Sequence, residues 1–169
     1  MSRKSVVLTI AAAVLGTSAF AFGPAPFWPF GGHDLENTRN PSAAVMIGPE
    51  NVGSLGVSWV FETGGGADCA VVLCDVSATA SLDGTSVYVP DWAGNLFSLD
   101  RRTGAVNWSR TMADYTGVTG NFTRATPAIH GNMLIFGDQG GRFFQGATLI
   151  AADKHTGDPI WATKVDEHP

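Results

Sequence analysis

The sequence predicts an all-β fold, a β-propeller built of four-stranded blades. First, 21 of the 169 residues are glycine and 9 are proline, and both residue types favour turns over helices. Second, short runs of β-branched and aromatic residues lie between these turns, as in strands. Third, the sequence repeats with a period of roughly 50 residues, the spacing of propeller blades. The chance alternative is a set of hairpins in a single sandwich.

The repeat consists of two pairs of matching segments. Residues 78–94 match residues 125–141 at an offset of 47, and residues 99–108 match residues 152–161 at an offset of 53. The offset grows because the second copy contains an insertion, which includes Phe143, Phe144 and Gln145. These three side chains either line a pocket at the rim or pack internally. Because the matches recur in register, the repeat favours the propeller.

One repeat unit shows its expected elements in order. A first strand begins at Ala78-Thr79, and further strands cover 86–89, 95–99 and 105–108. Residues 91–94 and 100–104 form the tight turns, in which a glycine takes positive φ. Trp92 in the first turn is expected to pack between blades. The repeated tryptophans are expected in the core; they are Trp59, Trp108 and Trp161.

The chain contains two full units and the outer piece of a third. A single blade cannot bury both of its faces without neighbours. We therefore expect about two to three blades of a propeller that has four to eight, and the front of a longer protein. Alone, these blades would expose apolar faces and strand edges, which favours aggregation.

Residues 1–21 have the pattern of a secretory signal peptide. Arg3 and Lys4 precede an apolar run over 6–15, and Ala19-Phe20-Ala21 is a cleavage signal. The alternative, a membrane anchor, needs about 20 apolar residues. We therefore predict a periplasmic or secreted protein without a membrane span, whose residues 22–169 are the propeller part.

Charge and cysteine content narrow the possible partners further. The formal net charge is −5 and the cations are scattered, which disfavours nucleic-acid binding. Export places Cys69 and Cys74 in an oxidising compartment, where they are expected to form a disulfide. The alternative is two free buried thiols.

The repeated pattern Ala-x-Asp-x-x-Thr-Gly-x-x-x-Trp resembles the tryptophan-docking motif of the quinoprotein dehydrogenases. Residues 151–161 carry the full pattern, and residues 98–108 carry it with serine in the alanine position. The N-terminal segments 28–39 and 59–64 also resemble these enzymes. Their Gly-Gly-His-Asp-Leu-x-Asn-Thr-Arg form is most similar to the polyvinyl alcohol dehydrogenase branch. The resemblance covers residues 27–169.

The resemblance implies an eight-bladed propeller with pyrroloquinoline quinone (PQQ) and a divalent cation, often Ca²⁺, on its axis. It also implies an alcohol substrate, a cytochrome c electron acceptor and a catalytic Asp, which is expected beyond Pro169. Two family features differ here. Val76 occupies the position of a Glu that contacts cofactor and metal, with Asp75 beside it. The disulfide between adjacent cysteines is absent.

Four residues are candidate site residues. Arg124 precedes an inner strand, at the position of Ser77 in the first unit, and is a candidate partner for a cofactor carboxylate; otherwise it is a surface arginine. Thr79 and Thr126 start equivalent strands and contact the cofactor or serve the fold. Asp75 is a candidate cation ligand or a solvated loop acid. No histidine is assigned a role.

The sequence therefore predicts an exported PQQ-dependent alcohol dehydrogenase that is similar to polyvinyl alcohol dehydrogenase. Two alternatives stay open. One is a propeller without cofactor that serves as a binding or assembly scaffold, which Val76 favours. The other is an inactive truncated fragment.

Overall fold

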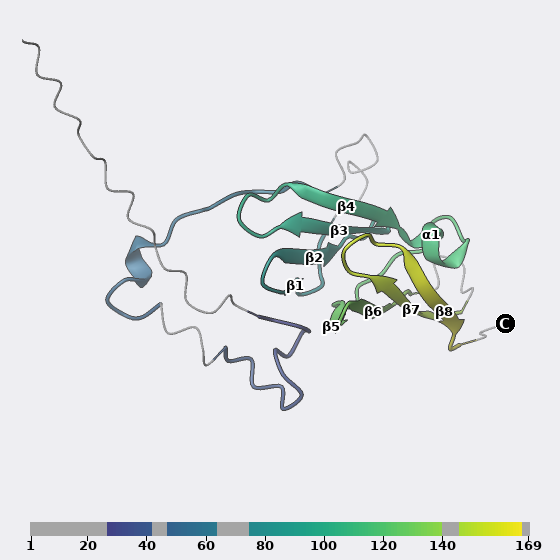
Figure 1. The fold of residues 1–169 in the computed structure, drawn as a ribbon, viewed down its shortest axis with the longest axis horizontal. Helices are drawn as coiled ribbons and strands as arrows, with labels where there is room; N and C mark the ends of the chain where they lie inside the picture. Colours follow the sequence, from purple (N-terminus) through teal and green to yellow (C-terminus); the bar gives the residue numbers. More distant parts are fainter. Residues whose placement is uncertain (1–26, 42–46, 64–74, 140–145, 167–169) are drawn as a thin grey trace, which may run out of the picture.

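The computed structural model describes residues 27–41, 47–63, 75–139 and 146–166, and contains two four-stranded antiparallel sheets (Figure 1). Both sheets are meanders whose strands lie in chain order. The first blade contains β1 (Ser81–Leu82), β2 (Ser86–Pro90), β3 (Asn95–Asp100) and β4 (Val106–Thr111). The second contains β5 (Ala128–His130), β6 (Met133–Gly137), β7 (Thr148–Asp153) and β8 (Pro159–Lys164). The predicted all-β architecture of four-stranded blades is confirmed.

The two blades repeat each other down to their register. In the first blade Ser81 pairs with Tyr88, Tyr88 with Ser98, and Ser98 with Trp108. The second blade has the same pairing between Ala128, Ile135, Ala151 and Trp161. Both sheets also shift register between the third and fourth strands, after Ser98 and after Ala151.

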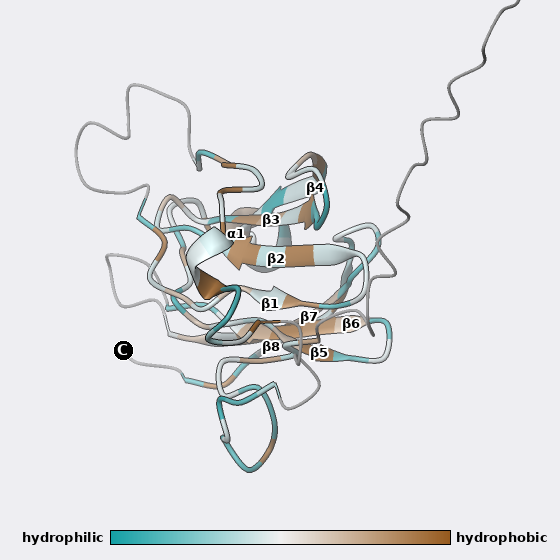
Figure 2. Ribbon diagram, turned by 90° about the vertical axis from the view of Figure 1, so that its left-hand side faces the viewer, coloured by the Kyte–Doolittle hydropathy of each residue, from teal (hydrophilic) through white to brown (hydrophobic). Residues whose placement is uncertain are grey.

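The main core lies between the two sheets, which are stacked one above the other (Figure 2). Alternating strand residues of both blades meet there because side chains on a strand point to opposite faces in turn. The members of this core are Tyr88, Leu96, Trp108, Met112, Tyr115, Ile129, Leu134, Phe136, Ile150 and Ala152.

The inner strands are shorter than the sequence predicts. They begin at Ser81 and Ala128 rather than at Ala78 and Ala125. Proline explains both late starts because it lacks the N–H that a ladder needs. Pro127 directly precedes β5, and Pro90 ends β2, which is the partner of β1.

A short helix, α1 (Met112–Thr116), connects the first blade to the second and was not predicted. The backbone N–H of Thr111 donates to the Asp114 carboxylate (2.7 Å), as in a capping box. The helix ends at Gly117, whose φ is 72°. The Tyr115 hydroxyl donates to the carbonyl of Gly157 (2.8 Å). Thus α1 ties the end of β4 to the last turn of the second blade.

Two segments that precede the first blade in the sequence pack against it, one beside its first strand and one beside its third strand and the following turn. Trp28 makes an antiparallel bridge with Leu82, and the Pro29 carbonyl accepts from Ile129 N–H (2.7 Å). Farther along, the 3-10 helix η1 (Val52–Ser54) leads into an extended stretch, residues 57–63. This stretch lies beside the first blade, where the rings of Phe61 and Phe97 are 5.1 Å apart.

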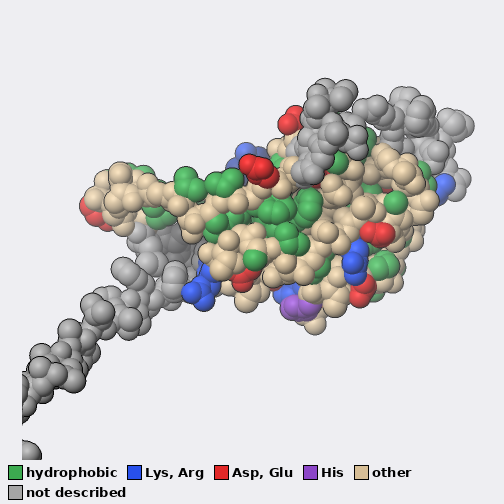
Figure 3. All heavy atoms as spheres, turned by 90° about the horizontal axis from the view of Figure 1, so that it is seen from above, with side chains coloured by type: hydrophobic (Ala, Val, Ile, Leu, Met, Phe, Trp, Pro, Cys, Tyr) green, Lys and Arg blue, Asp and Glu red, His purple; other side chains and the backbone are tan. Residues whose placement is uncertain are grey.

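Figure 3 shows apolar side chains along the arm that carries η1 and over the adjoining sheet. The exposed apolar residues of this arm are Val52, Leu55, Val57 and Val60. Part of this surface therefore remains open to solvent in the structure.

The repeated tryptophans occupy equivalent places but differ in burial. Trp108 is 8% exposed and lies in the core. Trp59 is only half-buried, and Trp161 is 40% exposed. The predicted core location is therefore confirmed for Trp108 and wrong for Trp161. Trp108 packs against a turn of the next blade, whereas no such turn among the described residues faces Trp161.

Signal peptide residues 1–21, Cys69, Cys74 and the insertion residues 143–145 lie outside the described residues. In the part of the chain that the structure describes, no helix has the length and apolar character needed to cross a bilayer.

Candidate functional site

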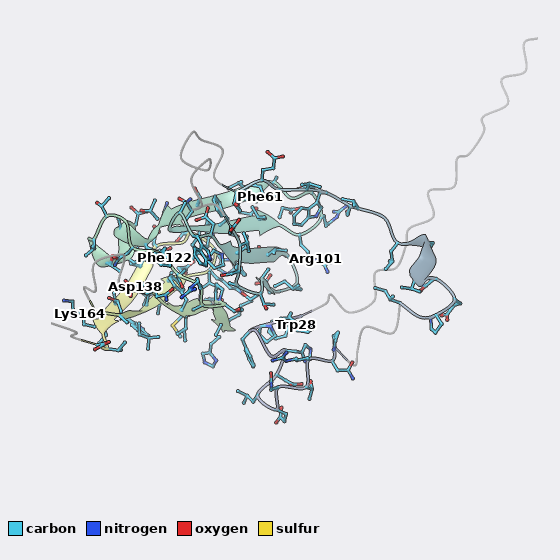
Figure 4. The ribbon with its side chains drawn as sticks, turned by 180° about the vertical axis from the view of Figure 1, so that it is seen from behind. Trp28, Phe61, Arg101, Phe122, Asp138 and Lys164 are labelled. Atoms are coloured by element: carbon cyan, nitrogen blue, oxygen red, sulfur yellow. The ribbon has the colours of Figure 1, made fainter. Side chains whose placement is uncertain are left out.

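The two ends of the sheets differ in their connections. One end, which we call the loop end, carries the turn 91–94, α1, residues 117–127 and residues 138–139. The opposite end, the turn end, carries the tight turns between strands, residues 83–85, 101–105, 131–132 and 154–158. Phe122 and Asp138 lie at the loop end, and Arg101 lies at the turn end (Figure 4). The candidate residue Arg124 belongs to the loop end.

Trp92 is the centre of a cluster at the loop end. Its ring stacks on Phe122, with centroids 5.9 Å apart and an interplanar angle of 26°. Its indole N–H donates to the Ser77 hydroxyl (2.7 Å), and its backbone N–H donates to the Asp75 carbonyl (3.0 Å). Trp92 thus contacts the segment ahead of β1 and the linker between the two blades.

Arg124 lies over the ring of Trp92, with Cζ 4.9 Å from the ring centroid. Its Nε donates to Oε1 of Gln139 (2.6 Å), and the Gln139 backbone N–H donates to the Phe122 carbonyl (2.9 Å). The guanidinium is therefore held on an aromatic face and at one edge. Its terminal nitrogens form no hydrogen bond with any described residue.

A hollow of about 310 Å³ adjoins this arginine. It is lined by Arg124, Ala125, Gly137, Asp138 and Gln139. A cation with unused donors beside a hollow favours an anionic ligand, and a planar guanidinium suits a carboxylate in particular.

Two buried aspartates hold the loops that carry this cluster. Asp91 accepts from the backbone and side-chain nitrogens of Asn95 (2.8 and 2.9 Å). Asp138, its equivalent in the second blade, accepts from Asn121 Nδ2 (2.7 Å) and from Thr148 N–H (2.5 Å). Both carboxylates are occupied within the fold, so their role here is to order the turns.

The other three candidate residues make no side-chain hydrogen bond with Arg124 or Trp92 in the described structure. Thr79 is exposed, ahead of β1. Thr126 is half-buried and faces the N-terminal segment, since its Oγ1 lies 3.5 Å from where a Cβ on Gly31 would be. Asp75 is exposed and contacts Trp92 only through its backbone carbonyl. The structure therefore brings Arg124 and Trp92 together, and leaves the carboxylate of Asp75 outside that cluster.

Within the described ranges, no three His, Cys, Asp or Glu side chains gather as metal ligands would. The proposed cation ligand Asp75 therefore belongs to no such group in this part of the chain. Val76 beside it is exposed.

The sequence interpretation missed Gln139 and Phe122. The repeat could have indicated Gln139, because this residue occupies in the second blade the position of Trp92 in the first. Phe122 lies in the linker between blades, outside the repeat, and has no such counterpart.

A second hollow, of about 300 Å³, lies at the turn end between the blades. Its lining is polar and includes Ser98, Asn107, Asp100, Lys154 and His155. The Lys154 ammonium is already paired with Asp83 (3.0 Å), and Ser98 accepts from Asn107 Nδ2 (3.2 Å). Its main polar groups are thus satisfied within the fold.

One solved structure supports the propeller fold. A europium-containing methanol dehydrogenase aligns over 82% of this chain at 22% identity, with a TM-score of 0.59. BamB from Moraxella catarrhalis aligns over 53% at 23% identity (TM-score 0.43), and a quinohemoprotein alcohol dehydrogenase from Comamonas testosteroni over 82% at 21% identity (TM-score 0.49). The chain spans 23%, 24% and 27% of the lengths of these three proteins, respectively.

Comparisons of sequence give the family. No curated protein matches the chain significantly. A family model described as outer membrane protein assembly factor BamB matches residues 51–168, which is well over half of the chain. That range includes both blades and the Trp59 stretch. With its two repeated four-stranded blades, the chain belongs to this family of PQQ-type β-propeller repeats.

Proposed function

We propose that this chain is part of an exported PQQ-dependent alcohol dehydrogenase, and that its loop end faces the cofactor. One observation carries the proposal: the guanidinium of Arg124 is fixed by Trp92 and Gln139 beside a hollow, with its terminal nitrogens unused by described residues. The resemblance of the repeat motifs to those of quinoprotein dehydrogenases supports PQQ as the ligand.

The residues present fit part of PQQ. The cofactor is a planar quinone that carries carboxylates, and Arg124 offers two parallel N–H donors to one of them. Contact with the Trp92 ring and the hydrogen bond to Gln139 restrict the guanidinium, so less side-chain entropy is lost when a carboxylate binds. In this proposal two electrons pass from an alcohol to the quinone and then to a cytochrome c. The task of Arg124 is to bind and orient the quinone. Thr79 and Thr126 are weaker candidates for the same contact.

The described residues do not supply a cation site. Asp75 is a candidate ligand for Ca²⁺, but a hard cation takes about six to eight oxygens, and no cluster of acids surrounds Asp75 in the described ranges. We therefore derive no step through a metal, and place the catalytic Asp outside this chain.

The second candidate function is a non-enzymatic assembly scaffold. The description of the matching family model, an outer membrane protein assembly factor, favours it. The exposed Val76, where the dehydrogenases carry a Glu, also favours it. In that case the Arg124 cluster would receive a carboxylate of a protein partner or serve only the fold.

Titration of PQQ into the full-length protein separates these candidates. Quenching of tryptophan fluorescence measures binding, and dye-linked oxidation of small and polymeric alcohols measures activity. Replacing Arg124 with methionine should weaken PQQ binding at least about tenfold, because a hydrogen bond to a charged group contributes about 1.5–3 kcal/mol. Arg102, an exposed arginine at the turn end, supplies the matched control Arg102→Met, which should bind normally.

Two results would count against the proposal. If the unmodified protein neither binds PQQ nor oxidises any alcohol, the scaffold function is favoured. If it binds PQQ and Arg124→Met binds equally well, PQQ lies elsewhere and the loop-end site is wrong.

A further inference from the structure

The interface between the blades contains an ion pair beside the docked tryptophan. The indole N–H of Trp108 donates to the Lys154 carbonyl (3.0 Å), and the Lys154 ammonium reaches back to Asp83 of the first blade (3.0 Å). The side chains of this pair are only 16% and 10% exposed. The same carboxylate accepts from the Tyr88 hydroxyl (3.2 Å) and from the backbone N–H groups of Thr85 and Ser86 (2.9 and 3.0 Å).

Arg101 occupies the position of Lys154 in the first blade, and its backbone repeats the same contacts. Its carbonyl accepts from the Trp59 indole N–H (2.9 Å), as that of Lys154 accepts from Trp108. Its N–H donates to the Thr85 carbonyl (2.9 Å), as that of Lys154 donates to Asn132 (2.9 Å). The two cations are therefore placed equivalently in their blades.

The two side chains differ in one respect. Lys154 has its carboxylate partner, whereas Arg101 has none: its buried Nε lacks a hydrogen-bond partner, and its guanidinium forms no ion pair with a described residue. A buried N–H without an acceptor is costly, so such groups are rare in native proteins. Arg101 lies at the turn end, on the side of the first blade that residues 57–63 cover (Figure 4).

We propose that Arg101 forms an inter-blade ion pair with a carboxylate on an adjoining blade of the same propeller. The carboxylate would follow the innermost strand of that blade, where Asp83 follows β1. The pair would therefore repeat the Lys154–Asp83 contact one blade earlier.

The stretch that contains Trp59 indicates which blade supplies the carboxylate for Arg101. This tryptophan packs on the first blade as Trp108 of β4 packs on the second, so residues 57–62 take the place of an outer strand belonging to the preceding sheet. The inner strands of that sheet would then adjoin Arg101, as β1 adjoins Lys154. Charge complementarity selects an acid at the turn, because arginine binds carboxylates through paired N–H groups.

The test uses the full-length protein with Arg101→Met, and with Arg102→Met as the neighbour in the same turn. Equilibrium unfolding is measured between pH 7 and pH 3. At pH 7, Arg101→Met should raise the equilibrium constant for unfolding about tenfold, since it leaves a carboxylate without its charged partner. Arg102→Met should change it little, and Arg101→Lys should restore part of the loss.

The pH dependence distinguishes an ion pair from simple packing. A carboxylate paired with arginine has a lowered pKa in the folded state, so the stability that the pair adds is present at pH 7 and is lost as the acid becomes protonated. The difference between the unmodified protein and Arg101→Met should therefore vanish towards pH 3 or below. Equal stability of the two arginine variants at pH 7, or a difference that is independent of pH, would overturn the proposal. A difference that depends on protein concentration would place the carboxylate on a second copy and would also overturn it.

Discussion

Two tryptophans dock on glycine turns in this molecule, and they are not equally well held. Trp108 covers Gly157 and is 8% exposed, while Trp59 covers Gly104 and is only half-buried. Around Gly157, Arg110 donates to the Thr156 carbonyl (3.1 Å) and to Asp158 (2.7 Å). Trp108 also belongs to a complete sheet, whereas Trp59 lies in a stretch that has no sheet partner among the described residues.

The difference shows that the docking motif alone does not bury its tryptophan. Both glycines have φ near +75° (73° and 75°), and both tryptophans donate to an equivalent carbonyl. Burial follows only where a whole sheet packs against the turn, because neighbouring strands exclude water from the ring's other face. The motif fixes the position of the ring, and sheet packing stabilises it.

The largest expected effect comes from removing the better-held ring. Trp108→Ala should lower the free energy of unfolding by about 4 kcal/mol, because it empties a core site. In the 169-residue chain, Trp161→Ala removes the same side chain from the equivalent position, where it is 40% exposed, and should cost less than about 1 kcal/mol. Denaturant unfolding measures both variants. Equal losses would show that burial is not what separates the repeated tryptophans.

The next effect tests the turn beneath that ring. In Gly157→Ala the new Cβ would lie 2.7 Å from Trp108 Cε3, at a φ of 75°, so overlap adds to backbone strain and should cost about 3 kcal/mol.

The matched control for this variant is Gly131→Ala. Gly131 also has a positive φ, 58°, but nothing lies within 4 Å of its added Cβ, so backbone strain alone should cost about 1 kcal/mol. Thermal unfolding of both variants measures the gap. Its disappearance would mean that the ring moves aside freely.

A smaller effect concerns the ion pair beside Trp108. Burial opposes ionisation of Asp83, but hydrogen bonds from Thr85 and Ser86 N–H and the charge of Lys154 outweigh it and lower its pKa from 3.8 to about 2. Asp83→Asn should therefore cost about 2 kcal/mol at neutral pH.

The sign of the pH effect follows from that lowered pKa. The stability from ionised Asp83 is present above pH 3.8 and is lost as the pH falls towards about 2. Unfolding of the unmodified protein and of Asp83→Asn should therefore converge over this range. Curves that stay parallel would assign the loss to packing or to the hydrogen bonds instead.

Much of the fold could be predicted from the repeat. Tight turns at Asp91–Gly94 and Asp100–Gly104 and the strands between them lie where the sequence places them, because turn chemistry and strand patterning are local. The inner strands were predicted too long, since the effect of Pro90 on β1 depends on pairing between strands. The helix α1 could not be predicted because its five residues are too few to show the spacing of apolar residues that marks a helix.

The candidate site was predictable only in part. Arg124 stands out because it takes the place of Ser77 before an inner strand. Its contacts with Trp92 and Gln139 depend on how two blades are packed, which a single sequence does not encode locally. The signal peptide and the Cys69–Cys74 disulfide stay predictions.

The insertion in the second copy falls between β6 and β7, at the loop end, whereas the turn between β7 and β8 keeps the length of its counterpart. The two docked tryptophans lie at the opposite end, over Gly104 and Gly157. A loop at the loop end can therefore change its length without altering the turns on which the tryptophans dock. Each blade thus separates variation in loop length from the turn on which the neighbouring tryptophan docks.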